Sequence, residues 1–128
     1  MIESDPAAVA ALQKFFTGFF CVFGSLLGSF TNVVILRMGE GRSVVFPPSA
    51  CPACHHQLHA IDLIPVFSWL SLRGRCRYCA SSISWQYPLV EFLCAVTVGS
   101  AYVRFGFSPL FPVNAAWGVI LLVVGSLW

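Results

Sequence analysis

Three apolar segments divide the chain. The first, FFTGFFCVFGSLLGSFTNVVIL, covers residues 15–36, and the second, YPLVEFLCAVTVGSAYV, begins at residue 87. The third, LFPVNAAWGVILLVVGSLW, covers residues 110–128. A helix needs about 20 predominantly apolar residues to cross the hydrocarbon core of a bilayer. The pattern therefore predicts an all-α membrane protein with about three transmembrane helices, at 15–36, 87–104 and 110–128.

The ends of this pattern have alternative interpretations. A cleaved signal peptide would have an apolar region of about 7–15 residues followed by a small-residue cleavage site. The first segment is longer and ends in VVILR, which favours an uncleaved span. RFGFSP joins the second and third segments into a tight hairpin. Because no polar flank follows the third, we expect a helix that stops at the membrane surface or a truncated piece of a longer protein.

Composition and charge set the orientation. Hydrophobic residues make up 58% of the chain and charged residues 9%, against about 25% charged in a typical soluble domain. Five basic residues lie in the stretch between the first two spans, namely Arg37, Arg42, Arg73, Arg75 and Arg77. The positive-inside rule then predicts a cytoplasmic loop at 37–86 and an extracytoplasmic N-terminus at 1–14. Arginines bracketed by spans do not indicate a nucleic-acid surface.

A stripe of small residues marks one face of the first helix. Gly24 and Gly28 are four positions apart, and Asn32 continues the stripe one turn later. Small residues let helices approach closely, and a buried amide can form a hydrogen bond across the contact. Asn32 is therefore expected either to form a hydrogen bond between helices or to be part of a polar site for a substrate or cofactor.

Two cysteine pairs dominate the loop. They are CPAC, with Cys51 and Cys54, and CRYC, with Cys76 and Cys79. Two residues between cysteines let one tight turn direct both sulfurs at a single ion, and two such turns complete a tetrahedral shell. About 21 residues separate the pairs, slightly more than the about 15–20 usual for zinc sites. The spacing predicts a zinc-ribbon-like loop in which a structural zinc supplies folding energy.

Other interpretations of the cysteines remain. Disulfides are disfavoured on a reducing cytoplasmic side. Thioredoxin-type redox chemistry leaves the second pair unexplained, and unliganded thiols are the plainest alternative. His55, His56 and His59 follow the first pair and are either substitute ligands or exposed loop residues. Cys21 and Cys94 lie in apolar segments, where we expect them to pack as small residues.

Charged residues near the loop leave two questions open. Arg73, Arg75 and Arg77 alternate, so an extended segment would place them on one face. They would either neutralise a four-thiolate zinc site or bind anionic headgroups. Glu91 lies near the start of the second span, where it would pair with Arg37 or contact a substrate or cofactor.

Several motifs occur together in one order: GSFTNVVILR, CPAC, DLIPVFSWLSLRGRCRYC and ISWQYPLVEFL. Together they resemble the N-terminal part of the type IV prepilin peptidases, over roughly residues 18–104. These are bacterial inner-membrane enzymes of type IV pilus and type II secretion systems. The resemblance implies cleavage of a basic leader from prepilins and pseudopilins, then N-methylation with S-adenosylmethionine. It also implies that the cysteine loop is cytoplasmic and handles the substrate.

The resemblance stops before the family's catalytic residues. These peptidases use two membrane-embedded aspartates in their C-terminal half, one as the base and one protonated. The aspartates of this sequence are Asp5, near the N-terminus, and Asp62, in the DLIP motif of the loop. We therefore expect no catalytic residue here and no proteolysis by the chain alone. Asn32, Asp62 and Glu91 are the candidate substrate or cofactor contacts.

Different classes of function thus remain open. The chain is expected to be the N-terminal part of a prepilin peptidase, as a fragment, a split protein or a degenerate homologue with a missing C-terminal half. Alternatively, it is a non-catalytic membrane scaffold or prepilin-binding protein with a structural zinc loop. Methyl transfer alone has little sequence support, because no GxGxxG fingerprint occurs. Prepilins and membrane lipids are the expected partners, and nucleic acid is not.

Overall fold

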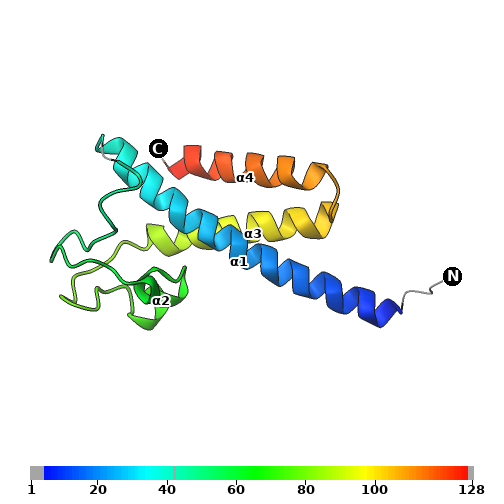
Figure 1. The fold of residues 1–128 in the computed structure, drawn as a ribbon, viewed down its shortest axis with the longest axis horizontal. Coiled ribbons are helices and arrows are strands. Elements are labelled where there is room, and N and C mark those ends of the chain that lie inside the picture. The colour runs from blue at the N-terminus through cyan, green and yellow to red at the C-terminus, as the bar shows by residue number, and fades with distance from the viewer. Residues whose placement is uncertain (1–4, 42, 127–128) are drawn as a thin grey trace.

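The three apolar segments form helices, and the second and third of these helices make a hairpin (Figure 1). We describe a computed structural model, which covers residues 5–41 and 43–126. Its elements are α1 (Pro6–Gly39), the 3-10 helix η1 (Ala60–Leu63), α2 (Phe67–Ser71), α3 (Gln86–Phe105) and α4 (Leu110–Ser126). Figure 1 shows α4 folding back along α3 while α1 crosses α3. The segment between α1 and α3 forms a separate lobe beside the first turns of α3.

Helix α1 is longer than the apolar pattern predicts, because it extends past residues 15–36 at both ends. It has 34 residues and begins at Pro6. The carboxylate of Asp5 accepts a hydrogen bond of 3.0 Å from the N–H of Ala7, which caps the helix. Proline suits the first helical turn because its missing N–H would be unpaired there. The Asp5 cap, Pro6 and the alanines that follow thus extend the helix beyond the apolar segment, toward the N-terminus.

Two of the described helices, α1 and α3, are long and apolar enough to cross a membrane. Helix α3 has 20 residues, which extend about 30 Å, the thickness of a hydrocarbon core. Helix α4 is also apolar but has 17 residues, fewer than the about 20 that a span requires. The third predicted helix is therefore present, but the part that the structure describes does not reach the length of a span.

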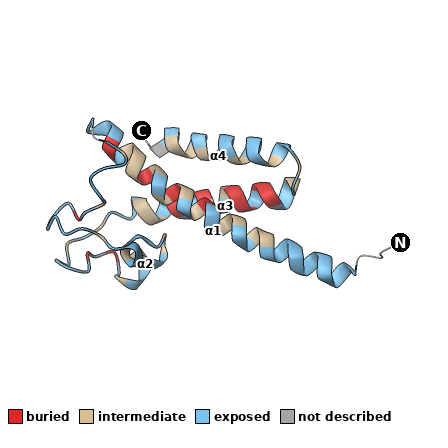
Figure 2. Ribbon diagram, in the orientation of Figure 1, coloured by how far each residue is buried: buried red, intermediate tan, exposed pale blue. Residues whose placement is uncertain are grey.

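The core lies where α1 crosses α3, and the small-residue stripe makes this contact (Figure 2). A Cβ atom added at Gly28 would lie 2.7 Å from the Cα atom of Glu91. One added at Gly24 would lie 2.6 Å from the carbonyl oxygen of Cys94. Both distances are far below a normal van der Waals separation, so only glycine permits this approach. Cys94 is fully buried beneath it, as expected of a small packing residue.

An aromatic cluster closes the opposite end of the bundle. Phe20 of α1 lies 4.7 Å from both Tyr102 of α3 and Phe111 of α4, measured between ring centroids. Phe16 contacts Phe107, in the turn between α3 and α4, at 4.9 Å with an edge-to-face geometry. Such pairs add about 0.5–1.5 kcal/mol each beyond the area they bury. The cluster joins all three long helices at the end remote from the loop.

We predict that Gly28→Ala weakens the pairing of α1 with α3. The added methyl group meets backbone atoms that cannot rotate away, and such overpacking costs about 1–3 kcal/mol. Gly18→Ala is the matched control, because a Cβ atom there meets nothing within 4 Å. Reversible unfolding in mixed detergent, followed by circular dichroism, should show a lower midpoint for the first variant only. Equal midpoints would mean that the close approach does not stabilise the pair.

Candidate metal centre

The two cysteine pairs of the loop converge on one point. The sulfur atoms of Cys51, Cys54, Cys76 and Cys79 all lie within 4.8 Å of one another. The Sγ atoms of Cys51 and Cys79, from different pairs, are 3.8 Å apart. All six cysteines of the chain are free thiols. The predicted convergence is therefore confirmed, and the four sulfurs could bind a metal ion.

Two turns of the same design position these sulfurs. In each, the N–H of the first cysteine donates to the carbonyl five residues on, at 3.0 Å in the first turn and 2.8 Å in the second. The carbonyl of that cysteine accepts from the N–H four residues on, at 2.8 and 3.0 Å. The residue after the second cysteine, His55 or Ala80, has φ of 57° in both turns. A single bridge closes each turn, Ala50 with Gln57 and Arg75 with Ser82.

The environment of the thiols is asymmetric. Cys51 and Cys76 are buried, whereas Cys54 and Cys79 are exposed. The backbone N–H of Cys54, followed by that of Ala53 and the Ser81 hydroxyl, lowers the pKa of Cys51 to about 6. The N–H of His56 opposes the shift at Cys54, but desolvation and the neighbouring thiols raise the pKa of that thiol to about 11. Four thiols this close cannot all ionise together unless a cation balances them.

Trp69 and Gly74 hold the second turn against α2. The indole N–H of Trp69 donates to the carbonyl of Ile83 at 3.1 Å. Its ring covers Gly74, where an added Cβ atom would lie 2.8 Å from the ring. Gly74 also has φ of 68°, a left-handed conformation that glycine adopts without strain. Both the close approach and the backbone angle therefore require glycine.

Asp62 lies in η1 and contacts the second cysteine turn. One carboxylate oxygen accepts a hydrogen bond of 2.7 Å from Arg77 Nε, and the other accepts from the Tyr78 hydroxyl at 3.0 Å. The backbone N–H of His59 adds a third donor at 3.2 Å. Arg77, and after it Tyr78, lowers the pKa of Asp62, so this side chain is ionised at neutral pH. Both oxygens of this candidate site residue are therefore engaged within the loop.

The histidines lie beside the four-cysteine cluster. His55, His56 and His59 are exposed, and none belongs to the four-ligand cluster. The ring of His56 stacks on that of Tyr78, with centroids 3.7 Å apart and planes inclined by 30°. This contact links the two cysteine turns through their side chains, which fits the expectation of exposed loop residues.

Glu91 and Arg37 do not form the expected ion pair. A carboxylate oxygen of Glu91 accepts a hydrogen bond of 2.7 Å from the backbone N–H of Val66. The guanidinium of Arg37 instead donates to three loop carbonyls, those of Ser43, Val44 and Pro47. Both side chains are buried, each with 8% of its surface exposed. Each finds a backbone partner in the loop, so the charges fasten loop segments to helices.

Val66, the partner of Glu91, has an unusual backbone. Its φ is 60°, which is rare for a β-branched residue. The N–H of Phe67 donates to the carbonyl of Pro65, so Val66 is the centre of a three-residue γ-turn. The turn directs the N–H of Val66 at Glu91. Sequence reasoning had no signal for this, because valine is expected in extended structure.

Asn32 forms a hydrogen bond between helices, which is one of its two predicted roles. Its side-chain amide donates to the carbonyl of Tyr87 in α3 at 3.1 Å. The residue is 6% exposed, one turn beyond Gly28. The bond is an additional one for a carbonyl of the first turn of α3, and it joins the two helices next to the loop.

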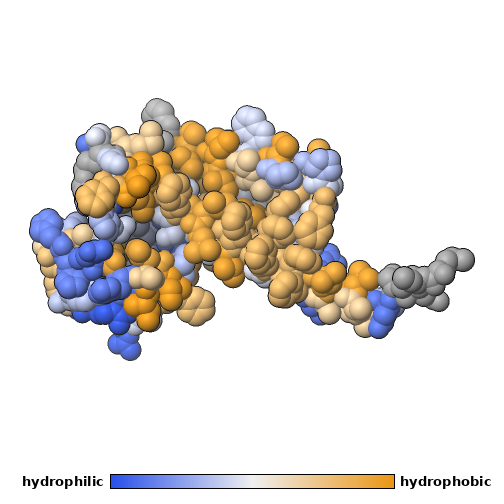
Figure 3. All heavy atoms as spheres, viewed as in Figure 1, coloured by the Kyte–Doolittle hydropathy of each residue, from blue (hydrophilic) through white to orange (hydrophobic). Residues whose placement is uncertain are grey.

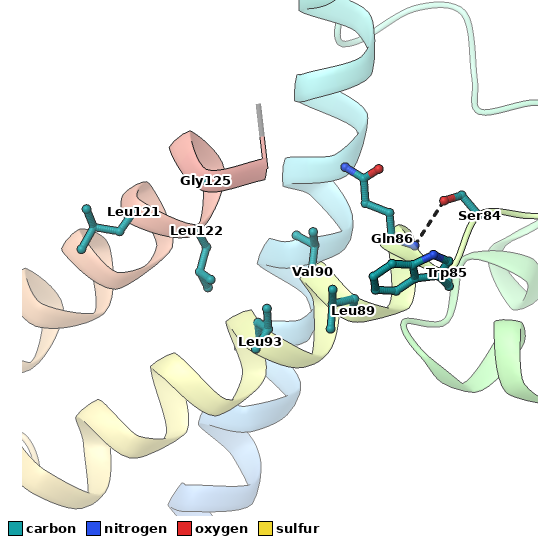
Figure 4. Close-up of a pocket in the computed structure, with 9 residues that line it drawn as sticks. All are labelled: Ser84, Trp85, Gln86, Leu89, Val90, Leu93, Leu121, Leu122 and Gly125. Carbon is teal, nitrogen blue, oxygen red and sulfur yellow. Dashed lines mark hydrogen bonds between the residues drawn. The ribbon is translucent and has the colours of Figure 1, made fainter. Parts of the chain in front are cut away.

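A shallow groove of about 520 Å³ lies between the start of α3 and the end of α4 (Figure 4). Its lining is Ser84, Trp85, Gln86, Leu89, Val90 and Leu93, with Leu121, Leu122 and Gly125 opposite. The walls are apolar, and polar groups gather only at the end nearest the loop, where the Ser84 hydroxyl accepts from the N–H of Gln86. None of the described residues in its lining has an ionisable side chain.

These features define a helical protein with two membrane-length helices and, between them, a loop whose four clustered sulfurs could bind a metal ion. The family profile described as the bacterial peptidase A24 N-terminal domain matches residues 22–105. The chain belongs to this family. The matched segment includes the crossing of α1 with α3 and the whole cysteine loop.

Relatives in several bacteria are prepilin leader peptidase/N-methyltransferases, which confirms the resemblance drawn from the motifs. The Myxococcus xanthus protein is 46% identical over 93 residues, which cover 73% of this chain and 28% of the relative. The Stutzerimonas stutzeri protein is 40% identical, over 68% of this chain and 38% of the relative. The Bacillus subtilis protein is 36% identical, over 80% and 42%. The chain thus spans less than half the length of these relatives. No solved structure matches it.

The left-handed residue after each cysteine pair leads to a prediction. Ala80→Val should destabilise the loop by about 1–2 kcal/mol, because a branched side chain is strained at positive φ. Ala80→Gly should keep or raise its stability. Trypsin cleavage after the arginines at 73, 75 and 77 reports loop opening and should be faster in the valine variant. Ala53→Val in the other turn, at an exposed site without positive φ, is the control. Equal cleavage of both valine variants would contradict the prediction.

Proposed function

We propose that this chain is the loop-bearing N-terminal part of a prepilin leader peptidase/N-methyltransferase and binds prepilins or pseudopilins. One observation carries the proposal: the segment that matches the family, residues 22–105, contains the C-terminal half of α1, the whole of α3 and all four clustered sulfurs. The relatives' names state the activity of proteins of which the matched segment covers 28–42%. For this chain we propose substrate binding in the service of that activity.

Zinc is the metal that we propose for the cluster. Four sulfurs placed about 2.3 Å from a tetrahedral zinc ion would be about 3.8 Å from one another. The Sγ atoms of Cys51 and Cys79 are separated by 3.8 Å. Donors also face the sulfurs, as the N–H of Tyr78 does at 3.5 Å from Cys76 Sγ, and such donors favour the thiolate. Four protein ligands leave no open position, so the ion would supply folding energy to the loop.

We propose that the loop faces the cytoplasm of a bacterium whose inner membrane the chain spans several times. The arginines of the loop support this orientation, since the side of a membrane protein richer in Lys and Arg remains inside. Cytoplasmic reductants would also keep the four thiols available for metal. Helices α1 and α3 would span the bilayer, with α4 returning beside α3 as a shorter third segment.

We propose that the chain alone does not cleave peptide bonds. Hydrolysis of the aspartic type requires two carboxyl groups that share one substrate. Asp5 caps α1 at the end remote from the loop, and Asp62 has both oxygens bound by loop donors. Asn32 and Glu91 are likewise bound to backbone groups. These contacts favour positioning roles for all three candidate residues over direct contact with a prepilin or with S-adenosylmethionine.

Metal removal tests the zinc proposal. Elemental analysis of the purified chain should find one zinc per chain, and Cys76→Ser should reduce it to a small fraction. A chelator should open the loop and accelerate trypsin cleavage at its arginines. Cys21→Ser is the control, because Cys21 lies in α1 outside the cluster and its loss should leave the zinc content unchanged. A well-folded sample without bound metal would refute the proposal.

Prepilin binding is tested with a substrate that carries a photoreactive group in its leader. We expect a crosslink to the chain in membranes and an intact leader after prolonged incubation. A full-length relative under the same conditions should release the leader. The crosslink should be lost in Cys76→Ser and kept in Cys21→Ser. If the chain releases the leader and Asp62→Asn abolishes this release, the expectation that the chain cannot cleave is wrong. If no crosslink forms, the chain does not bind prepilins.

A further inference from the structure

The loop exposes apolar side chains that its own packing does not use. They lie in η1, in α2 and between them, and we call them the α2 patch: Ile61, Leu63, Ile64, Phe67 and Leu70. Phe67 is 75% exposed and Ile61 is 60% exposed. In Figure 3 the loop lobe has hydrophilic atoms at its outer end and hydrophobic atoms on the side nearer the helices. A cluster of large exposed apolar residues outside a span indicates a contact surface.

The hydrogen bond between Glu91 and Val66 indicates how deep the α2 patch would lie relative to a membrane that α3 spans. Val66 precedes α2 directly, and its N–H lies 2.7 Å from a carboxylate oxygen of Glu91. Helix α3 begins at Gln86, so Glu91 is about 7.5 Å along it at about 1.5 Å per residue. The full length of α3 is needed to cross a hydrocarbon core of about 30 Å. The residues around Val66 therefore lie beside the first turns of α3, within about 7.5 Å of the boundary between headgroups and acyl chains.

Trp85 supports the same position of the membrane boundary. It immediately precedes α3 and is 66% exposed. Tryptophan is enriched where lipid headgroups meet the hydrocarbon. A membrane boundary at Trp85 puts the α2 patch at the surface of the bilayer and leaves the hydrophilic end of the lobe in water.

Positive charge follows the patch directly. Arg73 and Arg75 come just after α2 and are exposed, whereas Arg77 is paired with Asp62. The N–H of Arg73 donates to the carbonyl of Leu70 at 3.1 Å, which continues the turn of α2 into the arginine segment. Apolar side chains next to arginines are typical of segments that lie in an anionic membrane surface.

We propose that the α2 patch is an interfacial membrane anchor, which inserts its apolar side chains into the leaflet beside α3 while Arg73 and Arg75 contact anionic headgroups. The inference rests on the proposed membrane-spanning arrangement but does not depend on prepilin binding. The loop would then be attached to the bilayer by its own surface as well as by α1 and α3, with the metal centre held close to the membrane.

The test replaces single residues with a photoreactive phenylalanine analogue in the 128-residue chain. The patch position is Phe67, with Leu70 as a second, independent position. Phe30, exposed on α1, is the control for a lipid-facing span, and Gln57, exposed on the first cysteine turn, is the control for the aqueous part of the loop. Irradiation is carried out in cell membranes and in nanodiscs of phosphatidylglycerol or phosphatidylcholine. Mass spectrometry identifies the adducts.

We expect lipid adducts at positions 30, 67 and 70, at least severalfold above position 57. In phosphatidylglycerol, Arg73→Gln combined with Arg75→Gln should lower the patch adducts by about fivefold per arginine. Adducts at 30 without any at 67 and 70 would overturn the anchor and leave the spans intact. Adducts at 67 to a polypeptide would make the patch a protein interface and also overturn it. No adduct at 30 would refute the spans, and the anchor with them.

Discussion

The contact between the backbones of α1 and α3 at Gly28 determines the arrangement of the loop end of the protein. No side chain separates the helices there, and Asn32 bonds to the first turn of α3 one helical turn further on. Asn32, about two turns before the end of α1, and the first turn of α3 are therefore held next to each other. The helix pair brings the two ends of the loop toward each other, which reduces the entropy cost of folding the loop. The cysteine turns can then meet over a short span of chain.

The buried polar side chains of the described core share one kind of partner. Asn32, Arg37 and Glu91 each bond to backbone groups, and together they contact α3, the segment 43–47 and Val66. A buried charge must be satisfied where water is scarce, and an unpaired one would cost several kcal/mol. Backbone groups serve this purpose and also have fixed positions. The same bonds that satisfy these side chains therefore hold the loop against the helices.

Much of this arrangement follows from residue patterns. The apolar runs predict α1, α3 and α4, the small-residue stripe predicts the helix contact, and the cysteine spacing predicts the convergence of four sulfurs. What the patterns miss has a common cause. The partners of Arg37 and Glu91 are backbone groups, which every residue carries, so no residue type indicates them. An ion pair between the two was the natural inference from charge alone, and it is wrong. The γ-turn at Val66 is likewise hidden, because valine disfavours positive φ.

A strained turn persists only where surrounding contacts hold it. Two such contacts hold the turn at Val66, one on each side of it. Glu91 accepts from its N–H, and the next residues form α2, which Trp69 fastens to the second cysteine turn through Ile83. The turn at Val66 therefore lies between two attachments, one to the helix pair and one to the second cysteine turn. Relaxation of the turn would require that Glu91 lose its donor or that α2 separate from the cysteine turn. This coupling means that the position of α2 beside α3 and the shape of the cysteine loop are set together, through a single residue.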